Sequence, residues 1–122
     1  MNCKYVLFVS AAFNKPKRLN KYKDAIATYL KLITGNTPIK IGSIKTEHIR
    51  EILEKEGIQF DVHKQCTASL KASNTKLIRE CEECIFIIYK SNTKKSPIIN
   101  ELLKTAREEN KKCYVLRIEK YE

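Results

Sequence analysis

The sequence is poor in glycine, proline and long apolar runs: it has three glycines, three prolines and no tryptophan among 122 residues. The phosphate-binding pattern GxxxxGK[ST] and the dinucleotide-binding pattern GxGxxG are both absent. The apolar run that starts at Tyr5 is shorter than a signal-peptide core or a membrane span, so we expect a cytoplasmic protein with no membrane partner. No linker or repeat divides the chain, whose length suits a single domain, residues 1–122.

Acidic residues are also scarce. The chain has 14 Asp and Glu against 24 Lys and Arg, which gives a formal net charge of +10. Such a surface favours anionic partners, namely nucleotides, nucleic acids or acidic lipids. Because lysine greatly outnumbers arginine, a lysine-rich composition without functional meaning is the alternative explanation. The placement of the charges is therefore more informative than their sum.

Cysteine is present as an odd set of five: Cys3, Cys66, Cys81, Cys84 and Cys113. Several of them lie in or beside apolar strand patterns, which predicts reduced, buried thiols and not a disulfide framework. Cys81 is expected at the end of a helix and Cys84 at the start of a strand. The pair forms a CxxC pattern, but a zinc site needs about four ligands and no second CxxC accompanies it. We expect no metal and no cofactor.

Short runs rich in β-branched and aromatic residues predict five strands, at 5–10, 39–41, 58–62, 85–89 and 114–118. Segments with helical periodicity lie between them and predict four helices. Gly57 is placed to end the second helix and Pro97 to begin the fourth, and Thr46, Ser73 and Asn74 are candidate caps. The alternation predicts a single Rossmann-like α/β domain with a mostly parallel five-stranded sheet and helices on both faces.

The loops that lead from each strand into the next helix carry charge of one sign. In parallel sheets, ligands bind outside the carboxyl ends of the strands. Loops 11–18, 43–46, 64–72 and 90–96 contain nine Lys and Arg residues and no Asp or Glu. A rim of this kind concentrates anions, whereas the alternative is that surface loops of a lysine-rich protein simply collect lysines.

The residues expected to bind the ligand are of four kinds. The cations expected to contact phosphates are Lys15, Lys17, Arg18, Lys45, Lys94 and Lys95. The polar side chains expected to contact sugar or phosphate oxygens are Ser10, Ser43, Ser91, Asn92, Thr93 and Ser96. Phe13 and Tyr89 are expected to contact a base, and Tyr22 is a further aromatic side chain that could stack on one; a hydrophobic plug is the alternative for Phe13. Gly42 is expected to let a backbone amide approach a phosphate, with a tight turn as its alternative.

Glu101 is the candidate catalytic residue. It lies in the first turns of the fourth predicted helix, where a carboxylate can act as a general base, a ribose-hydroxyl acceptor or a nucleophile. The alternative is a solvent-facing glutamate paired with Lys104 or Lys95. His63 lies at the same edge of the predicted sheet without an evident partner.

Residues 72–118 carry a family resemblance. A strand at 84–88 follows a helix and is succeeded by a serine-containing loop, by Glu101 early in the next helix and by a return strand at 111–116. This order resembles the C-terminal half of SLOG and nucleoside deoxyribosyltransferase-like Rossmannoid proteins, and it is similar to the terminal half of TIR domains. The resemblance implies binding or turnover of nucleotide-derived signals such as ADP-ribose derivatives. The glycines and the aspartate that accompany the family's glutamate are absent here, which favours binding over catalysis.

We therefore expect the chain to sense or sequester a phosphate-bearing nucleotide derivative, such as an ADP-ribose-type or cyclic nucleotide signal. Short, lysine-rich, single-domain chains are typical of phage proteins, so by analogy a viral anti-defence sponge is one form of this function. One alternative is an enzyme that cleaves an N-glycosidic bond with Glu101, and another is a nucleic-acid-binding protein. The expected partners are a nucleotide-derived small molecule and further copies of the chain in a homo-oligomer.

Overall fold

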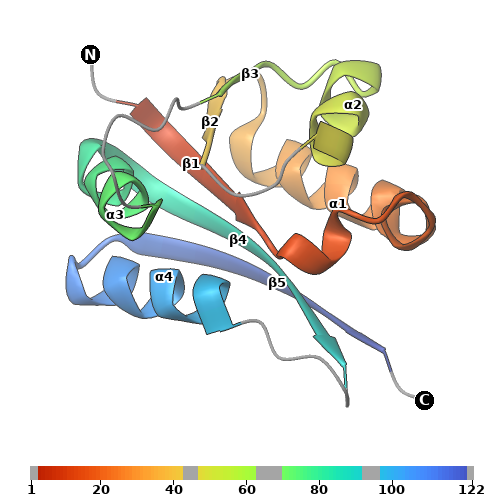
Figure 1. Cartoon of the computed structure of the whole chain (residues 1–122). Coiled ribbons are helices and arrows are strands. Elements are labelled where there is room, and N and C mark those ends of the chain that lie inside the picture. Colours follow the sequence, from red (N-terminus) through yellow and green to blue (C-terminus); the bar gives the residue numbers. More distant parts are fainter. Residues whose placement is uncertain (1–2, 43–46, 63–69, 92–96, 121–122) are drawn as a thin grey trace.

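A computed structural model describes residues 3–42, 47–62, 70–91 and 97–120, whose arrangement is shown in Figure 1. In chain order the elements are β1 (Cys3–Val9), the 3-10 helix η1 (Ala11–Phe13), α1 (Pro16–Thr34), β2 (Ile39–Ile41), α2 (Glu47–Lys55), β3 (Phe60–Val62), α3 (Leu70–Glu80), β4 (Cys81–Ser91), α4 (Pro97–Glu108) and β5 (Lys112–Lys120). The predicted alternation of strand and helix is confirmed, with η1 as an addition between β1 and α1.

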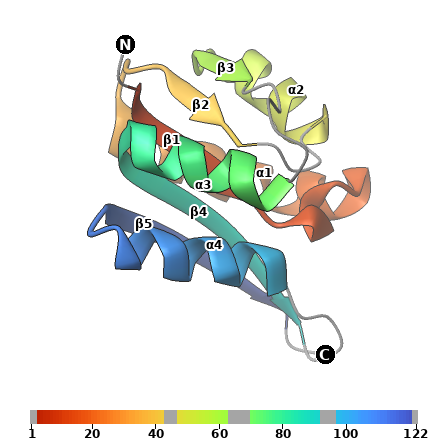
Figure 2. The ribbon, with the colours of Figure 1, turned by 60° about the vertical axis from the view of Figure 1, so that its left-hand side comes forward.

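The strands form one parallel sheet in the order β3-β2-β1-β4-β5. Helices α1 and α2 cover one face of this sheet, and α3 and α4 cover the other (Figures 1 and 2). The predicted Rossmann-like α/β architecture is thus confirmed. The order of the strands reverses between β1 and β4, because the chain first moves outward from β1 to β3 and then returns beside β1. Sheets of this kind bind ligands at such a switch point.

Two apolar cores lie on the two faces of the sheet. Side chains of β1 alternate between them, as the twofold period of a strand requires. Tyr5, Leu7 and Val9 pack with α1 and α2, whereas Val6 and Phe8 pack with α3 and α4. The uninterrupted apolar run of β1 is explained by this burial on both faces. Within the described residues, no helix has the length and apolar character that crossing a membrane requires.

The helix boundaries match only some of the predicted signals. Gly57 follows α2 with a φ of 70°, and Pro97 is the first residue of α4, as predicted. Ser73 and Asn74, predicted as caps, instead lie buried inside α3, because that helix begins before them. Cys81, expected at a helix end, is the first residue of β4.

The described cysteines are free thiols that pack in the core beneath α3 and α4. Cys3 lies beside Cys81 on the neighbouring strand, and Cys84 lies beside Cys113 in the same way. Burial raises the pKa of the Cys84 thiol to about 12 and also raises the pKa values of Cys81 and Cys113. These thiols remain protonated at neutral pH, as expected of small apolar core residues. Cys66 lies outside the described residues.

Glu83 of β4 forms side-chain contacts with β1 and β5 near the amino-terminal ends of the three strands. Its two carboxylate oxygens are 2.8 Å from Lys4 Nζ and 2.8 Å from the Tyr114 hydroxyl, which donates to it. Lys112 Nζ lies 4.0 Å away, and only 12% of the Glu83 side chain is exposed. The hydrogen bond from Lys4 is the main cause that lowers the pKa of Glu83 below its usual range.

Replacing Glu83 by glutamine is expected to lower the free energy of unfolding at neutral pH by about 1–2 kcal/mol, since charge-assisted hydrogen bonds are lost. The folded pKa is depressed, so the contribution of Glu83 is complete above its unfolded pKa, about 4.3, and disappears as pH falls through the folded value. Urea unfolding across the acidic range should therefore show a shallower loss of stability in Glu83→Gln than in the original chain. Glu82→Gln is the control, because that side chain is 60% exposed. Parallel acid profiles for Glu83→Gln and the original chain would contradict the assignment.

Candidate functional site at the switch point

The carboxyl end of β1 and the adjoining part of β4 form the candidate site. β1 pairs with β4 up to Val9 and Ile87, whereas β4 continues beside β5 as far as Ser91. Ser10 prolongs the contact, because its N–H donates to Ile87 O at 2.9 Å and its Oγ accepts from the N–H of Tyr89 at 3.2 Å. The chain then turns through η1 into α1, which brings the first turns of α1 against Tyr89.

Three aromatic side chains pack together at this turn. The ring of Phe13 meets the ring of Tyr89 edge-on, with centroids 5.4 Å apart, and meets that of Tyr22 edge-on at 6.2 Å. Phe13 and Tyr89 are only 1% and 2% exposed, while Tyr22 is half-buried. Edge-to-face contacts between aromatic rings fix their relative orientation. The cluster therefore holds the start of α1 firmly on β4.

Arg18 covers the aromatic cluster on its outer side. Its guanidinium carbon lies 4.5 Å from the centroid of the Tyr89 ring, and its NH1 group donates to Ala12 O at 3.0 Å. A guanidinium has five N–H donors and remains charged at any physiological pH. Because stacking and one hydrogen bond already hold it in place, the remaining donors are presented to a ligand at little entropic cost.

A cavity of about 280 Å³, here called the basic pocket, lies beside this arginine. It is lined by Lys15, Lys17, Arg18, Lys21, Tyr22 and Tyr89. None of its four cations forms an ion pair with any residue that the structure describes. They surround the first turns of α1, which contain no acid, and the N-cap residue Lys15 makes no side-chain cap hydrogen bond. The positive end of a helix favours anions, so this crowding of cations is locally unfavourable until an anion joins it.

The structure brings four of the predicted ligand-binding residues together, namely Lys15, Lys17, Arg18 and Tyr89. Ser10 and Phe13 are buried beside them and hold Tyr89 in position through the contacts described above. Ser91 is the last residue of β4, and its side chain is not among those described. The other predicted residues at this edge lie outside the described residues: Ser43, Lys45, Thr46, His63, Asn92, Thr93, Lys94, Lys95 and Ser96.

Gly42 has a packing role at the end of β2. Its N–H donates to Leu7 O at 2.9 Å, so its own amide serves the contact with β1, whereas the residues that follow it, 43–46, lie outside the described residues. A Cβ at this position would lie 2.2 Å from Cε1 of Phe8, closer than side-chain atoms can approach. Glycine is needed here because the buried Phe8 ring occupies the space of a side chain.

Lys21 is a pocket residue that the loop-based prediction does not include, and Tyr22 enters the prediction only as a further aromatic side chain for a base. The prediction ended with the loop at Arg18, although α1 begins at Pro16. On a helix, residues three and four positions apart share a face, and Lys21 and Tyr22 stand in this relation to Arg18. Helical spacing from Arg18 was the signal that could have found them.

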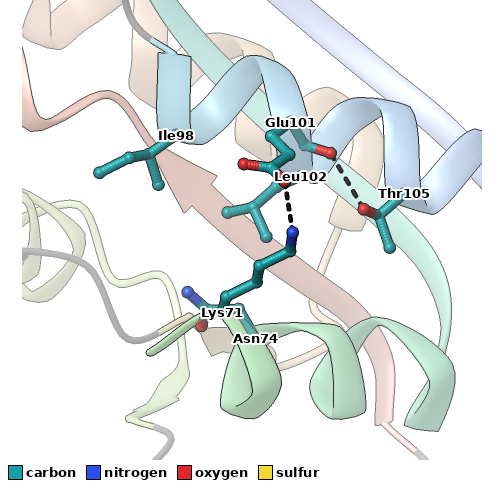
Figure 3. A pocket seen from close by; sticks show the side chains of 6 residues that line it. All are labelled: Lys71, Asn74, Ile98, Glu101, Leu102 and Thr105. Atoms are coloured by element: carbon teal, nitrogen blue, oxygen red, sulfur yellow. Dashed lines mark hydrogen bonds and ion pairs between the residues drawn. The ribbon is translucent and has the colours of Figure 1, made fainter. Parts of the chain in front are cut away.

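Glu101 lines a separate cavity of about 220 Å³ between the first turns of α3 and α4 (Figure 3). Its carboxylate forms an ion pair of 2.6 Å with Lys71 of α3, and 54% of its side chain is exposed. The expected glutamate–lysine pair thus exists, but the partner among the described residues is Lys71 of another helix and not Lys104, and Lys95 lies outside the described residues. Apolar atoms of Ile98 and Leu102 line most of the remaining wall.

The hydrogen bond from Lys71 lowers the pKa of Glu101 below its usual range. The same contact raises the pKa of Lys71. At neutral pH both groups are charged and paired, so Glu101 does not store a proton for general acid catalysis. It does not line the basic pocket. The cations and the candidate catalytic carboxylate therefore belong to two cavities, not one.

In the described ranges, no group of three or more His, Cys, Asp and Glu side chains is arranged to hold a metal ion. Comparison with known proteins finds no match: no protein-family model, curated protein or solved structure is similar to this chain.

Proposed function

We propose that the basic pocket binds a phosphate-bearing nucleotide derivative, which the chain senses or sequesters. The observation that carries the proposal is one cavity lined by four cations and two tyrosines at the switch point of a parallel sheet. Those cations have no ion-pair partner among the described residues. A bound anion provides the missing charge compensation.

Phosphate oxygens are expected to lie among Lys15, Lys17, Arg18 and Lys21. The first backbone N–H groups of α1 add donors there, because the first turn of a helix leaves its N–H groups without acceptors within the helix. Arg18 is suited to a bidentate contact with two oxygens of one phosphate. The half-buried Tyr22 provides an aromatic surface for the sugar or the base.

The size of the pocket restricts how a ligand is held. Small-molecule sites usually measure roughly 300–1,000 Å³, and the basic pocket lies just below this range. It therefore suits the phosphorylated part of a nucleotide, while the rest extends along the carboxyl edge of the sheet. β4 ends at this edge with Ser91.

Isothermal titration calorimetry against ADP-ribose, a cyclic dinucleotide and nucleoside monophosphates tests the proposal. We expect saturable binding of at least one phosphorylated ligand and much weaker binding of its dephosphorylated nucleoside. Added salt should weaken the binding because the contacts are ionic. Flat titrations with every ligand would refute the proposal.

Two further measurements separate the alternatives. Chromatography of the incubated ligand should show no free base, because none of the described residues that line the basic pocket is an aspartate or a glutamate. Base release that Glu101→Gln abolishes would instead establish the glycosidic-bond-cleaving enzyme. If only long oligonucleotides bind, and if their affinity decreases steeply with salt, the function would instead be nucleic-acid binding.

A further inference from the structure

The two edges of the sheet are built differently. β3 forms one edge with three residues, Phe60–Val62, and carries the exposed charge of Asp61. Short edge strands and edge charges are devices that prevent a sheet from pairing with another chain. β5 forms the other edge with nine residues and contains neither proline nor glycine. Its charged residues, Lys112, Arg117, Glu119 and Lys120, lie on either side of four consecutive uncharged residues. No strand in the described part of the chain pairs with the outer side of β5.

The middle of β5 is apolar and only partly covered. Four consecutive residues, Cys113, Tyr114, Val115 and Leu116, are half-buried. Cys113 and Val115 pack toward the core beneath α4, and Tyr114 and Leu116 toward the core on the face of α1. Along the outer side of an edge strand, every second residue presents an unpaired backbone N–H and C=O. Another strand can form hydrogen bonds with this whole row of groups.

We propose that β5 pairs in antiparallel orientation with β5 of a second copy, so that two sheets become one continuous sheet in a homodimer. An antiparallel ladder has the same hydrogen-bond pattern seen from either strand, which makes it compatible with an exact twofold axis. A parallel ladder is slanted and lacks this symmetry. Two copies of β5 therefore form a closed, symmetric pair that leaves neither of these edges exposed.

The side chains select the register. Centring the ladder on Val115 places Tyr114 opposite Leu116 of the second copy, an aromatic–aliphatic pair that occurs twice. It also brings Lys111, which directly precedes β5, level with Glu119 of the second copy just beyond each end of the ladder. Lys111 Nζ donates one hydrogen bond, to Arg79 O at 3.2 Å, and an ammonium has two donors left.

The two neighbouring symmetric registers, centred on Leu116 and on Tyr114, are less favourable. Centring the ladder on Leu116 places Lys112 directly opposite Lys120 of the second copy, also twice. Like charges directly opposite each other destabilise a strand pair. Centring the ladder on Tyr114 shortens it to the five residues 112–116. The register centred on Leu116 pairs all nine residues of β5 and the register centred on Val115 pairs seven, residues 112–118, but the latter avoids the opposition of like charges. The register centred on Val115 is therefore the one that charge favours.

Light scattering coupled to size-exclusion chromatography tests the dimer. We expect a twofold mass that persists better in high salt, because two chains of +10 repel each other and salt screens that repulsion. Val115→Lys, which places two lysines at the axis, should raise the dissociation constant at least about tenfold. Asp61→Lys at the β3 edge is the matched control and should leave the mass unchanged. A monomeric mass for the original chain at high concentration overturns the proposal.

Hydrogen–deuterium exchange of the unaltered chain keeps the test independent of how well Val115→Lys folds. Outer-edge amides of β5 should become better protected as concentration rises, while those of β3 should not. Val115→Cys tests the register, because it should form more disulfide-linked dimer under air oxidation than either the original chain or Leu116→Cys. Exchange that does not depend on concentration overturns the pairing, and preferential linking through Leu116→Cys overturns the register.

Discussion

Replacing Arg18 by alanine is expected to weaken binding of a phosphorylated nucleotide by about tenfold to hundredfold, as the loss of one or two charge-assisted hydrogen bonds implies. Arg18 is the cation of the basic pocket that the structure holds most firmly, through the ring of Tyr89 and the carbonyl of Ala12. A group that is already ordered loses little entropy on binding, so more of its interaction energy appears as affinity. Titration calorimetry with the ligand that binds the original chain measures the change.

Two variants separate this role from general charge and from folding. Arg107→Ala removes the same charge from the exposed last turn of α4 and should leave the affinity nearly unchanged. Arg18→Lys keeps the charge but loses the planar fork and its stacking, so an intermediate affinity is expected. Thermal unfolding of each variant shows whether the fold is intact. If Arg18→Ala binds as tightly as Arg107→Ala, the phosphate does not lie in the basic pocket.

The flexible lysines of the pocket are expected to act differently. Lys15, Lys17 and Lys21 are exposed side chains, whose contacts with a phosphate cost conformational entropy and are screened by salt. Their contribution lies mainly in attracting the anion to the pocket and only secondarily in orienting it. Arg18 is therefore expected to orient the bound phosphate, and the exposed lysines are expected mainly to attract it.

Local sequence signals predicted the elements of the fold, because strands and helices have different apolar periods and glycine and proline mark their ends. Gly57 and Pro97 show this. The same signals misassigned Ser73 and Asn74, whose side chains suit a helix cap by chemistry but are buried within α3. Which strands are neighbours is a tertiary property, so the place where β4 returns beside β1 was not predictable from periodicity.

The candidate site was predictable where it coincides with a loop and less so where it continues onto a helix. Lys15, Lys17 and Arg18 lie within the segment 11–18, predicted as a loop after the first strand, whereas Lys21 is a pocket residue only because α1 repeats every 3.6 residues. The ion-pair partner of Glu101 could not be predicted from local sequence spacing. Lys71 is thirty positions earlier in the sequence, and only the packing of α3 against α4 brings the two charges together.

Gly42→Ala is expected to lower the free energy of unfolding by about 2–3 kcal/mol, in the range found when a packed core must accept extra volume. The added Cβ would lie 2.2 Å from Cε1 and 2.4 Å from Cδ1 of Phe8. That ring is buried and stacked on Phe86 with centroids 5.5 Å apart, so it has no free space to move into. Urea unfolding measures the loss, and the nucleotide affinity of the folded variant should be unchanged, because Gly42 does not line the basic pocket.

A double-mutant cycle with Phe8→Leu tests whether the ring is the cause. A smaller side chain at position 8 leaves room for the new methyl group, so the double variant should lose at least about 1 kcal/mol less than the sum of the two single losses. Gly35→Ala is the contrasting control, since a Cβ there meets nothing within 4 Å and its cost comes from a φ of 57°. Phe8→Leu should not relieve that backbone cost. Additive losses for Gly42→Ala and Phe8→Leu would show that contact with Phe8 is not what requires glycine at the end of β2.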